Sequence, residues 1–560
     1  MKYRLITRWC FGLAVAGGMY CTSVNDIAGG SSSTDNGKVV GMVRGEDGLP
    51  ASNTQVTLRS TLFNPNHDTV SSAMDTTDSE GMYAFDSLAA GIYTIEAVQL
   101  ESRTRALVNS IMIDSTTTHA EVASLAQPGA LKIELSGCVD ESCYIYVPGT
   151  SLYGLVRDGI GFIDSVPAGL VPAVYYADQS DPSSIHTIKT GIIIGSGATR
   201  IIADNSAWSH SAQIILNTTE SGADVAANVY DFPVLLRLSE KNFDFSTAGS
   251  NGNDLRFRKR DDTPLPYEIE RWDATAGHAE VWVRVDTVFG NDSSRFFMMY
   301  WGNAAAASES NGTAVFDTIA GFQGVWHLAD VGNDVVPDAT GNHYDGTASN
   351  MSSVSPVEGV VGAARDFDGK SGYISMPATA DSKLDFPQNG TYSMSLWAYA
   401  DTIDSVFHAI AGKGHEQYYM QLKCLGEGRA TWEFVEFQDQ VGWEYTEDST
   451  PPAPSSKNWV HLTGVRSGNE QHFYVNGELV IDTIALMAGD YARNTGDNFT
   501  IGRFSRSVAI PYQQGWSWFN GKVDEVRLMT RVLTDDEVRL CYMNQKSDDE
   551  LVIIKRNSQK

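Results

Sequence analysis

The amino-acid sequence predicts an all-β, multi-domain protein organised as a chain of β-sandwiches. Short runs of alternating apolar and polar residues, bounded by Gly, Asn, Asp and Pro, recur to the end of the chain. No long stretch with a helical period follows the apolar segment at the N-terminus. At 560 residues the chain is too long for one hydrophobic core, so roughly three to five domains are expected.

Composition and charge argue against two classes of protein. The chain has 40 Lys and Arg against 69 Asp and Glu, which gives a formal net charge of −29. Such a charge repels polyphosphates, so no nucleic-acid binding is expected. Because 42% of the residues are hydrophobic, the chain should fold into packed cores instead of remaining disordered.

The N-terminal segment is typical of an export signal. Basic residues precede an apolar run over residues 9–20, which is too short to span a bilayer. The run ends at Cys21, and a flexible Gly- and Ser-rich linker covers residues 21–36. The segment resembles a bacterial lipoprotein signal, which implies removal of residues 1–20 and a lipid anchor on Cys21 at the outer membrane or cell surface. Cleavage after Ala16, giving a free secreted protein, is the alternative.

The remaining cysteines fit an oxidising compartment. Cys138 and Cys143 are separated by four residues, a spacing that suits a disulfide closing a short β-hairpin. A zinc half-site is the weaker alternative, because no second Cys or His pair follows nearby. Cys424 and Cys541 are far apart in the sequence, and the sequence leaves their pairing open.

Two related modules follow the linker. Residues 37–126 contain "GKVVGMVRGEDG" and "TTDSEGMYAFDSLAAGIYTIEAV", and they resemble the carboxypeptidase regulatory-like domain. That resemblance implies a transthyretin-like β-sandwich that serves as a non-catalytic spacer. In residues 127–204 the element "DSVPAG" repeats the earlier "DSLAAG", so a degenerate second copy of the same module is predicted.

The third segment, residues 205–318, contains "YDFPVLLRLSEKNFDFS", "NDLRFRKRDDTPLPYEIERWD" and "FFMMYWGNAAAASES". These phrases resemble the bacterial domain of unknown function 2341, a family that implies no particular activity. The segment also has a basic cluster of Arg256, Arg258, Lys259 and Arg260. We interpret this cluster as solvated strand edges that discourage pairing between sheets.

The fourth segment, residues 319–545, contains "GVWHLADVGNDVVPDATGNHYDGTAS", "AARDFDGKSGYISMP" and "WVHLTGVRSGNEQHFYVNGELV". It resembles the laminin-G-like domain, which implies a concanavalin A-like jelly roll. Independently, Asn476-Gly477 between two alternating runs predicts a type I′ hairpin turn. Residues 546–560 are assigned as a C-terminal tail.

The acidic stretch "FNGKVDEVRLMTRVLTDDEV" raises the question of catalysis. Strict strand alternation places Asp524 on one face with Val526 and Leu528, and Glu525 on the opposite face. Two carboxylates on opposite faces cannot flank one scissile bond, so no catalytic residue is assigned. Further on, Thr534 followed by three acids predicts the start of a helix.

A calcium site is the sharper hypothesis for the acidic residues. The turn "PDATGNHYDG" concentrates Asp338, Asn342 and Asp345, whose oxygen ligands suit a hard cation. The laminin-G-like resemblance implies that Asp524 completes the site. Alternatively, Asp338 and Asn342 stabilise the turn, and Asp524 accepts hydrogen bonds from backbone amides.

Four aromatic residues form the predicted ligand-binding set. Trp443 and Tyr445 share one strand face, as do Trp516 and Trp518, and both pairs lie in contexts rich in Gly or Gln. Aromatic faces stack on the C–H surfaces of sugars. Some of these rings are expected to pack under their own loops instead.

The sequence therefore predicts an exported, non-catalytic binding protein of the cell envelope whose C-terminal jelly roll binds polysaccharide or another glycan, with calcium as the possible cofactor. A scaffold that binds other proteins is the first alternative, and an unrecognised polysaccharide hydrolase is the second. The sequence does not give the ligand, the protein partners or the oligomeric state.

Overall fold

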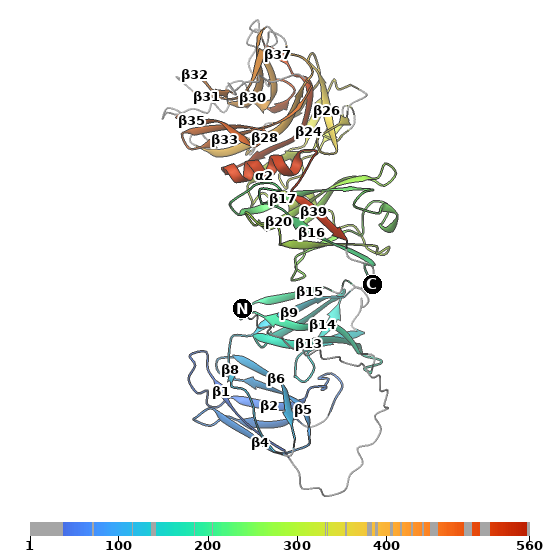
Figure 1. Ribbon diagram of the computed structural model, residues 1–560, viewed down its shortest axis with the longest axis vertical. Helices are drawn as coiled ribbons and strands as arrows, with labels where there is room; N and C mark the ends of the chain where they lie inside the picture. The colour runs from blue at the N-terminus through green and yellow to red at the C-terminus, as the bar shows by residue number, and fades with distance from the viewer. Residues whose placement is uncertain are drawn as a thin grey trace, which may run out of the picture. The chain divides into compact units, whose positions relative to one another are not determined.

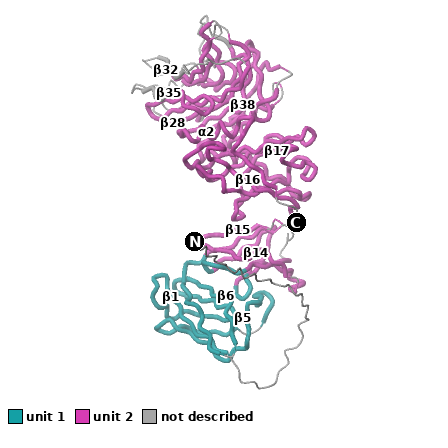
Figure 2. The backbone as a smooth tube through the Cα atoms, in the orientation of Figure 1, with its two compact units in different colours: residues 1–128, 147–151, 167–172 teal, residues 129–146, 152–166, 173–560 magenta. Residues whose placement is uncertain are grey.

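The computed structural model has 54% strand and 4% helix, which confirms the all-β prediction. The chain divides into two compact units, which we describe separately (Figure 2). None of the helices in the described part of the chain is long and apolar enough to cross a membrane. The structure describes residues 37–556 except 70–71, 115, 136–141, 184, 204, 206, 331, 333, 353–355, 378–382, 387–389, 404–406, 415–416, 427–428, 439–441, 448–456, 486–495 and 505–515.

The first unit contains a sandwich of two four-stranded sheets. Its sheets have the orders β4-β1-β7, with β8 also paired to β1, and β3-β2-β5-β6. Alternate residues of β1 are buried, so Val39 and Val43 enter a core that also holds Val56 and Ile95. The strands are β1 (Gly37–Arg44), β2 (Gln55–Ser60), β3 (Ala73–Thr76), β4 (Met82–Leu88), β5 (Gly91–Val98), β6 (Arg105–Ile113), β7 (Thr117–His119) and β8 (Ala123–Ser124).

The next strands form one seven-stranded sheet in the order β14-β13-β10-β11-β12-β9-β15. Ser165 in "DSVPAG" has a φ of 57°, and Ser87 in the matching "DSLAAG" has a φ of 62°. The repeated element therefore adopts the same left-handed backbone in both places. The strands are β9 (Gly129–Glu134), β10 (Cys143–Tyr146), β11 (Tyr153–Arg157), β12 (Ile160–Val166), β13 (Gly169–Asp178), β14 (Ile185–Ile194) and β15 (Thr199–Ala203).

The segment that resembles the domain of unknown function is a second sandwich. Its two sheets have the orders β17-β20-β19 and β18-β21-β16-β39, and Phe232, Val283 and Met299 lie in the core between them. The elements are β16 (His210–Leu216), β17 (Val229–Ser239), η1 (Phe245–Thr247), β18 (Arg256–Arg258), β19 (Tyr267–Asp273), β20 (His278–Val288), β21 (Phe296–Trp301) and α1 (Gly312–Val315).

The last segment is a two-sheet jelly roll. An eight-stranded sheet has the order β25-β26-β38-β28-β33-β34-β35, with β22 also on β38. A nine-stranded sheet has the order β23-β24-β27-β36-β29-β30-β31-β32, with β37 on β29. Asn476 and Gly477 both have positive φ, which fits the predicted type I′ turn. The strands are β22 (Phe322–Trp326), β23 (Val335–Val336), β24 (Gly346–Ser349), β25 (Val357–Glu358), β26 (Ala363–Asp368), β27 (Tyr373–Met376), β28 (Thr391–Ala400), β29 (Phe407–Lys413), β30 (Tyr418–Gly426), β31 (Arg429–Gln438), β32 (Gly442–Glu447), β33 (Trp459–Ser467), β34 (Glu470–Val475), β35 (Glu478–Ala485), β36 (Phe499–Ile501), β37 (Trp516–Trp518) and β38 (Asn520–Met529).

The jelly roll is followed by helix α2 (Asp535–Gln545), which packs on both sandwiches. The Thr534 side chain accepts a hydrogen bond from the Glu537 amide at 3.2 Å, which confirms the predicted helix start. Val538 enters the core shared by the two sandwiches, whereas Leu540 enters the core of the earlier sandwich alone. The Asn544 side chain exchanges two hydrogen bonds with the backbone of Leu235 in β17.

The chain then returns to the earlier sandwich. Residues 546–560, predicted to be a tail, contain strand β39 (Val552–Arg556), and it pairs antiparallel with β16 (Figure 1). Leu551 just before β39 is fully buried in the same core. The assignment as a tail was therefore wrong, because this short apolar run completes a sheet that begins more than 300 residues earlier.

We predict that truncation after Lys546 will destabilise this sandwich. The truncation removes the fully buried Leu551 and the packing of Val552 and Ile554, so the free energy of unfolding should fall by roughly 3 kcal/mol or more. Thermal and urea unfolding of the parent and the truncated chain would measure this loss of stability. A chain ending at Arg556 is the matched control and should unfold like the parent. Equal stability of all three chains would mean that β39 adds nothing.

Candidate functional site

Strand β38 contains a β-bulge that places its acidic residues differently from the prediction. Opposite it on β28, Trp397 pairs with Asp524 and Ser395 with Arg527, so two residues of β38 face one of β28. Glu525 at the bulge has a φ of 51°, in the left-handed region. The bulge interrupts the regular alternation of side chains between the two faces of β38.

The consequence is a common face for both carboxylates. Val523, Val526 and Leu528 all lie in the jelly-roll core, whereas Asp524 and Glu525 lie on the other face of the sheet. The predicted alternation was therefore wrong for Asp524, which lies opposite Val526 and Leu528, whereas Glu525 lies opposite them as predicted. Both carboxylates are nevertheless buried, with exposed fractions of 0% and 1%.

Asp524 stabilises a turn of the jelly roll. Its Oδ2 accepts hydrogen bonds from the amides of Val360 and Val361 at 2.7 and 2.9 Å. Its Oδ1 is buried and has no hydrogen-bond partner. Burial, followed by the charge of Glu525, raises the pKa of Asp524 well above its ordinary value. Asp524 thus matches the hydrogen-bonded alternative that the sequence left open.

Glu525 forms the central ion pair of the cluster. Its Oε1 lies 2.5 Å from Nδ1 of His327, and its Oε2 accepts hydrogen bonds from Arg527 at 2.6 and 3.2 Å. Burial alone would raise the pKa of Glu525, but the charges and hydrogen bonds of His327 and Arg527 lower it to about 2. Glu525 is therefore a charged, fully paired carboxylate.

Strand β19 of the earlier sandwich contributes two more carboxylates. Glu268 Oε2 lies 3.3 Å from Nε2 of His327. Glu270 Oε2 accepts a hydrogen bond from Trp282 Nε1 at 2.7 Å and lies 3.6 Å from His327 Nδ1. Burial raises the pKa of Glu270 to about 8. Burial would lower the pKa of His327, but the surrounding carboxylates raise it well above its ordinary value.

Aromatic rings surround this charged cluster. The guanidinium carbon of Arg527 lies 4.4 Å from the centre of the Trp282 ring and 5.2 Å from that of Phe316. The rings of Trp282 and His327 stack with their centres 6.2 Å apart. Sequence reasoning did not bring Glu268, Glu270 and His327 together as site residues, because Glu268 and His327 are 59 positions apart in the chain. A histidine just after a buried strand was the only local signal.

The predicted calcium residues have internal partners. The four donors to the Asp338 carboxylate are the amides of Val325, Thr340 and Tyr344 and the Thr340 hydroxyl, at 2.8–3.0 Å. Asn342 Nδ2 donates to the carbonyl of Gln323 at 2.9 Å. These contacts match the turn-stabilising alternative for both residues. Asp524 has its own separate partners, and calcium binding by this set stays a prediction.

Of the predicted ligand-binding aromatics, the side chain of Trp518 is described. It is half-buried and packs edge-on against Tyr373, with ring centres 5.8 Å apart. The guanidinium carbon of Arg503 lies 3.5 Å from the Tyr373 ring centre and 5.4 Å from that of Trp518. We call these three residues the aromatic–arginine cluster. Trp443 and Tyr445 lie on β32 and Trp516 on β37, but their side chains are outside the described set.

The cysteines divide into two groups. Cys424 and Cys541 are both buried and are not joined in a disulfide, which answers the question that the sequence left open. Burial raises the pKa of the Cys541 thiol to about 12, so this thiol is unreactive. Cys143 is buried in β10, whereas Cys138 and Cys21 lie outside the described residues. The predicted Cys138–Cys143 disulfide therefore stays a prediction.

The basic cluster of the sandwich is only partly solvated. Arg256 and Arg258 are each 7% exposed, and Arg256 donates hydrogen bonds to backbone carbonyls at 2.6 and 2.8 Å. The interpretation of all four residues as solvated strand edges was therefore wrong for these two. Lys259 and Arg260 instead line a pocket.

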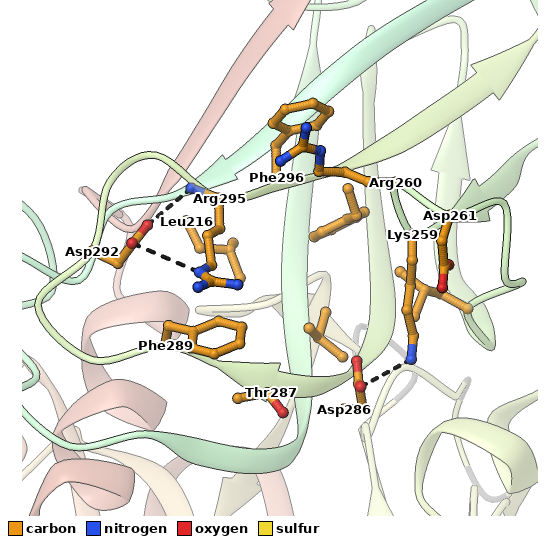
Figure 3. Close-up of a pocket in the computed structure, with 13 residues that line it drawn as sticks. Leu216, Lys259, Arg260, Asp261, Asp286, Thr287, Phe289, Asp292, Arg295 and Phe296 are labelled. Atoms are coloured by element: carbon orange, nitrogen blue, oxygen red, sulfur yellow. Dashed lines mark hydrogen bonds and ion pairs between the residues drawn. The ribbon is translucent and has the colours of Figure 1, made fainter. Parts of the chain in front are cut away.

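This pocket has a volume of about 340 Å³ (Figure 3). Arg295 lies over the ring of Phe289 at 3.8 Å, and Arg260 lies over Phe296 at 5.0 Å. Lys259 Nζ is 2.9 Å from Asp286. The apolar walls come from residues of β16, β20 and β21 and from Leu265 and Phe289 next to the strands, so the pocket combines apolar surface with partly neutralised charges.

Comparison with known proteins supports two of the resemblances. Residues 368–539 match the family model described as the concanavalin A-like lectin/glucanases superfamily, and residues 251–329 match the domain of unknown function DUF2341. A search of curated proteins finds no match.

Three solved structures are among those similar to the chain. The botulinum neurotoxin serotype D binding domain is 11% identical, with 40% of this chain and 52% of that chain covered and a TM-score of 0.31. Domain 4 of AbnA, a GH43 extracellular arabinanase from Geobacillus stearothermophilus, is 20% identical, with 39% of this chain and 97% of that chain covered and a TM-score of 0.30. The binding domain of Paraclostridial Mosquitocidal Protein 1 is 15% identical, with 40% of this chain and 52% of that chain covered and a TM-score of 0.31. The chain thus spans about half the length of the neurotoxin domain. It contains a concanavalin A-like jelly roll next to a DUF2341 domain.

We predict that Glu525→Gln strongly destabilises the protein. The substitution keeps the size of the side chain but leaves His327 and Arg527 buried without their carboxylate, which should cost about 3–5 kcal/mol. Urea unfolding of the full chain measures this change. Glu358→Gln is the control, because Glu358 is 81% exposed, and its effect should stay below about 0.5 kcal/mol. A loss below about 1 kcal/mol for Glu525→Gln would show that the pair is dispensable.

Proposed function

We propose that this protein is an exported binding protein of the cell envelope and that its jelly roll binds carbohydrate. The aromatic–arginine cluster is the observation that carries the proposal. Trp518 and Tyr373 are half-buried, and Arg503 lies beside both. Aromatic faces stack on sugar C–H groups, while a guanidinium donates hydrogen bonds to sugar hydroxyls or carboxylates. The match of residues 368–539 to the lectin/glucanase superfamily supports carbohydrate binding by the jelly roll.

We propose binding without hydrolysis. A glycosidase needs two carboxyl groups that reach one glycosidic bond. Asp524 and Glu525 share a face, but both are fully buried, and Glu525 is paired with His327 and Arg527. Glu433 and Glu436 on β31 are 2% and 7% exposed and are paired with cations of the jelly roll. These four carboxylates are therefore closed to a polysaccharide in this conformation.

The proposal predicts retardation of the full chain in affinity gels that contain plant or bacterial polysaccharides. Trp518→Ala should weaken binding to a retarding polysaccharide roughly three- to tenfold, because one aromatic contact contributes about 0.5–1.5 kcal/mol. Tyr153→Ala is the control, since Tyr153 is 46% exposed in a different module. The full chain is used because α2 and β39 connect the jelly roll to the earlier sandwich.

Three outcomes would contradict the proposal or the role it gives to Trp518. Absence of retardation by every polysaccharide would favour a scaffold that binds protein. Steady release of reducing sugar from a polysaccharide that binds would make the protein an enzyme. A melting temperature that falls in Trp518→Ala with unchanged retardation would assign Trp518 to packing.

Anchoring through Cys21 is the second part of the proposal, based on the N-terminal resemblance. Cys21→Ala should move the protein from the detergent phase to the aqueous phase in a phase-partition assay, because each buried methylene of the acyl chains contributes about 0.8 kcal/mol. Cys10→Ala is the matched control, because Cys10 lies within the segment that the signal peptidase would remove. Partition of parent and Cys21→Ala into the same phase would refute lipid anchoring.

A further inference from the structure

We propose that Glu270, His327 and Glu525 form a binding site for one divalent transition-metal ion of the Zn²⁺ class, at the junction of the DUF2341 sandwich and the jelly roll. One ligand atom from each residue lies within 4.8 Å of the other two. The residues come from β19, from the position after β22 and from β38. The site is distinct from the predicted calcium set and from the aromatic–arginine cluster.

The donor atoms suit a zinc-type ion. His327 Nδ1 faces Glu525 Oε1 at 2.5 Å and Glu270 Oε2 at 3.6 Å. One imidazole nitrogen with two carboxylate oxygens is a donor set that Zn²⁺ binds at about 2.0–2.2 Å, which separates the donors by roughly 3.3 Å. Small side-chain rotations would give that geometry. They would lengthen the distance from His327 Nδ1 to Glu525 Oε1 by under about 1 Å and shorten the longest distance between two of the three ligand atoms. A water molecule would complete the coordination.

The outer contacts are those of a metal-bound histidine. In metal sites the second ring nitrogen of the histidine commonly donates to a carboxylate, which fixes the tautomer and the ring. Here Nε2 of His327 lies 3.3 Å from Glu268 Oε2. Arg527 holds Glu525 Oε2, which leaves Oε1 directed at His327. Trp282 Nε1 orients the carboxylate of Glu270.

Unpartnered oxygens provide an independent observation. Glu270 has a side chain that is 2% exposed, and its Oε1 has no hydrogen-bond partner. Oδ1 of the neighbouring Asp524, a fully buried residue, has none either. A buried carboxylate oxygen without a donor is costly. A cation bound at the cluster would offset that cost.

The proposed role of the ion is to join the two domains. Glu270 lies on β19 of the DUF2341 sandwich, whereas Glu525 lies on β38 of the jelly roll and His327 follows β22, which pairs with β38. An ion bound to all three stabilises the joined arrangement by mass action, by about 2.7 kcal/mol at a hundredfold excess over the dissociation constant. Protons compete with the ion for these ligands, so binding should strengthen as the pH rises.

The test measures zinc bound to the full chain. Protein treated with a chelator and dialysed is incubated with Zn²⁺, desalted and analysed by inductively coupled plasma mass spectrometry. We expect one equivalent of zinc in the parent and less than a fifth of that in His327→Gln. His472→Gln is the matched control, a more exposed histidine of the same jelly roll, and should retain zinc. Glu268→Gln should weaken zinc binding about 10- to 100-fold through loss of the outer contact.

A spectroscopic measurement on the parent keeps the test independent of variant folding. Co²⁺ in place of Zn²⁺ should give the visible d–d absorption of a four- or five-coordinate site, and one equivalent of Zn²⁺ should abolish it. Circular dichroism checks that each variant is folded. The proposal is overturned if the parent retains no zinc, if Co²⁺ gives only the spectrum of the hydrated ion, or if folded His327→Gln retains as much zinc as the parent.

Discussion

The ion pair of Glu525 with His327 and Arg527 is the interaction on which the C-terminal half of the molecule depends. Removing these charges from water costs several kcal/mol per group, and only close, well-directed partners offset that cost. The partners lie on both sides of the domain junction, because Glu268 and Trp282 of the DUF2341 sandwich contact His327 and Arg527. A junction built in this way tolerates few alternative arrangements, since any slip would leave charges buried and unpaired.

The polar junction is surrounded by apolar packing that joins the same two domains. Leu235 and Trp282 of the earlier sandwich share one core with Val325, Met529 and Val538 of the jelly roll and α2. Helix α2 and strand β39 then extend the junction into the earlier sandwich. Domain boundaries drawn from sequence resemblance therefore separate segments that fold as neighbours with a common core. For the carbohydrate proposal, this means that the jelly roll presents its aromatic–arginine cluster from a fixed support.

Local sequence rules predicted the features that depend on neighbours in the chain. The alternation of apolar and polar residues identified the strands. Asn476-Gly477 identified a hairpin turn, and Thr534 identified the start of α2. Each of these features depends on a few adjacent residues. The face of Asp524 could not be predicted in this way, because the extra residue of a bulge shifts the alternation between the residues before it and those after it. The convergence of Glu268, Glu270 and His327 was also hidden, since it results from packing between domains. Strand β39 was missed because its partner lies at the opposite end of the two-domain region.

The late pairing of β39 has a consequence for how the chain acquires its structure. Leu235 and Asn544 are 309 positions apart, and contacts of such separation form late because a long loop must close first. Until residues 552–556 have been synthesised and have paired with β16, the outer edge of β16 has unpaired amides and carbonyls. Such an open edge can associate with other strands. A chain interrupted before Val552 would keep that edge open. A chain without residues 552–556 would therefore present an open edge of β16 that proteases and chaperones can recognise.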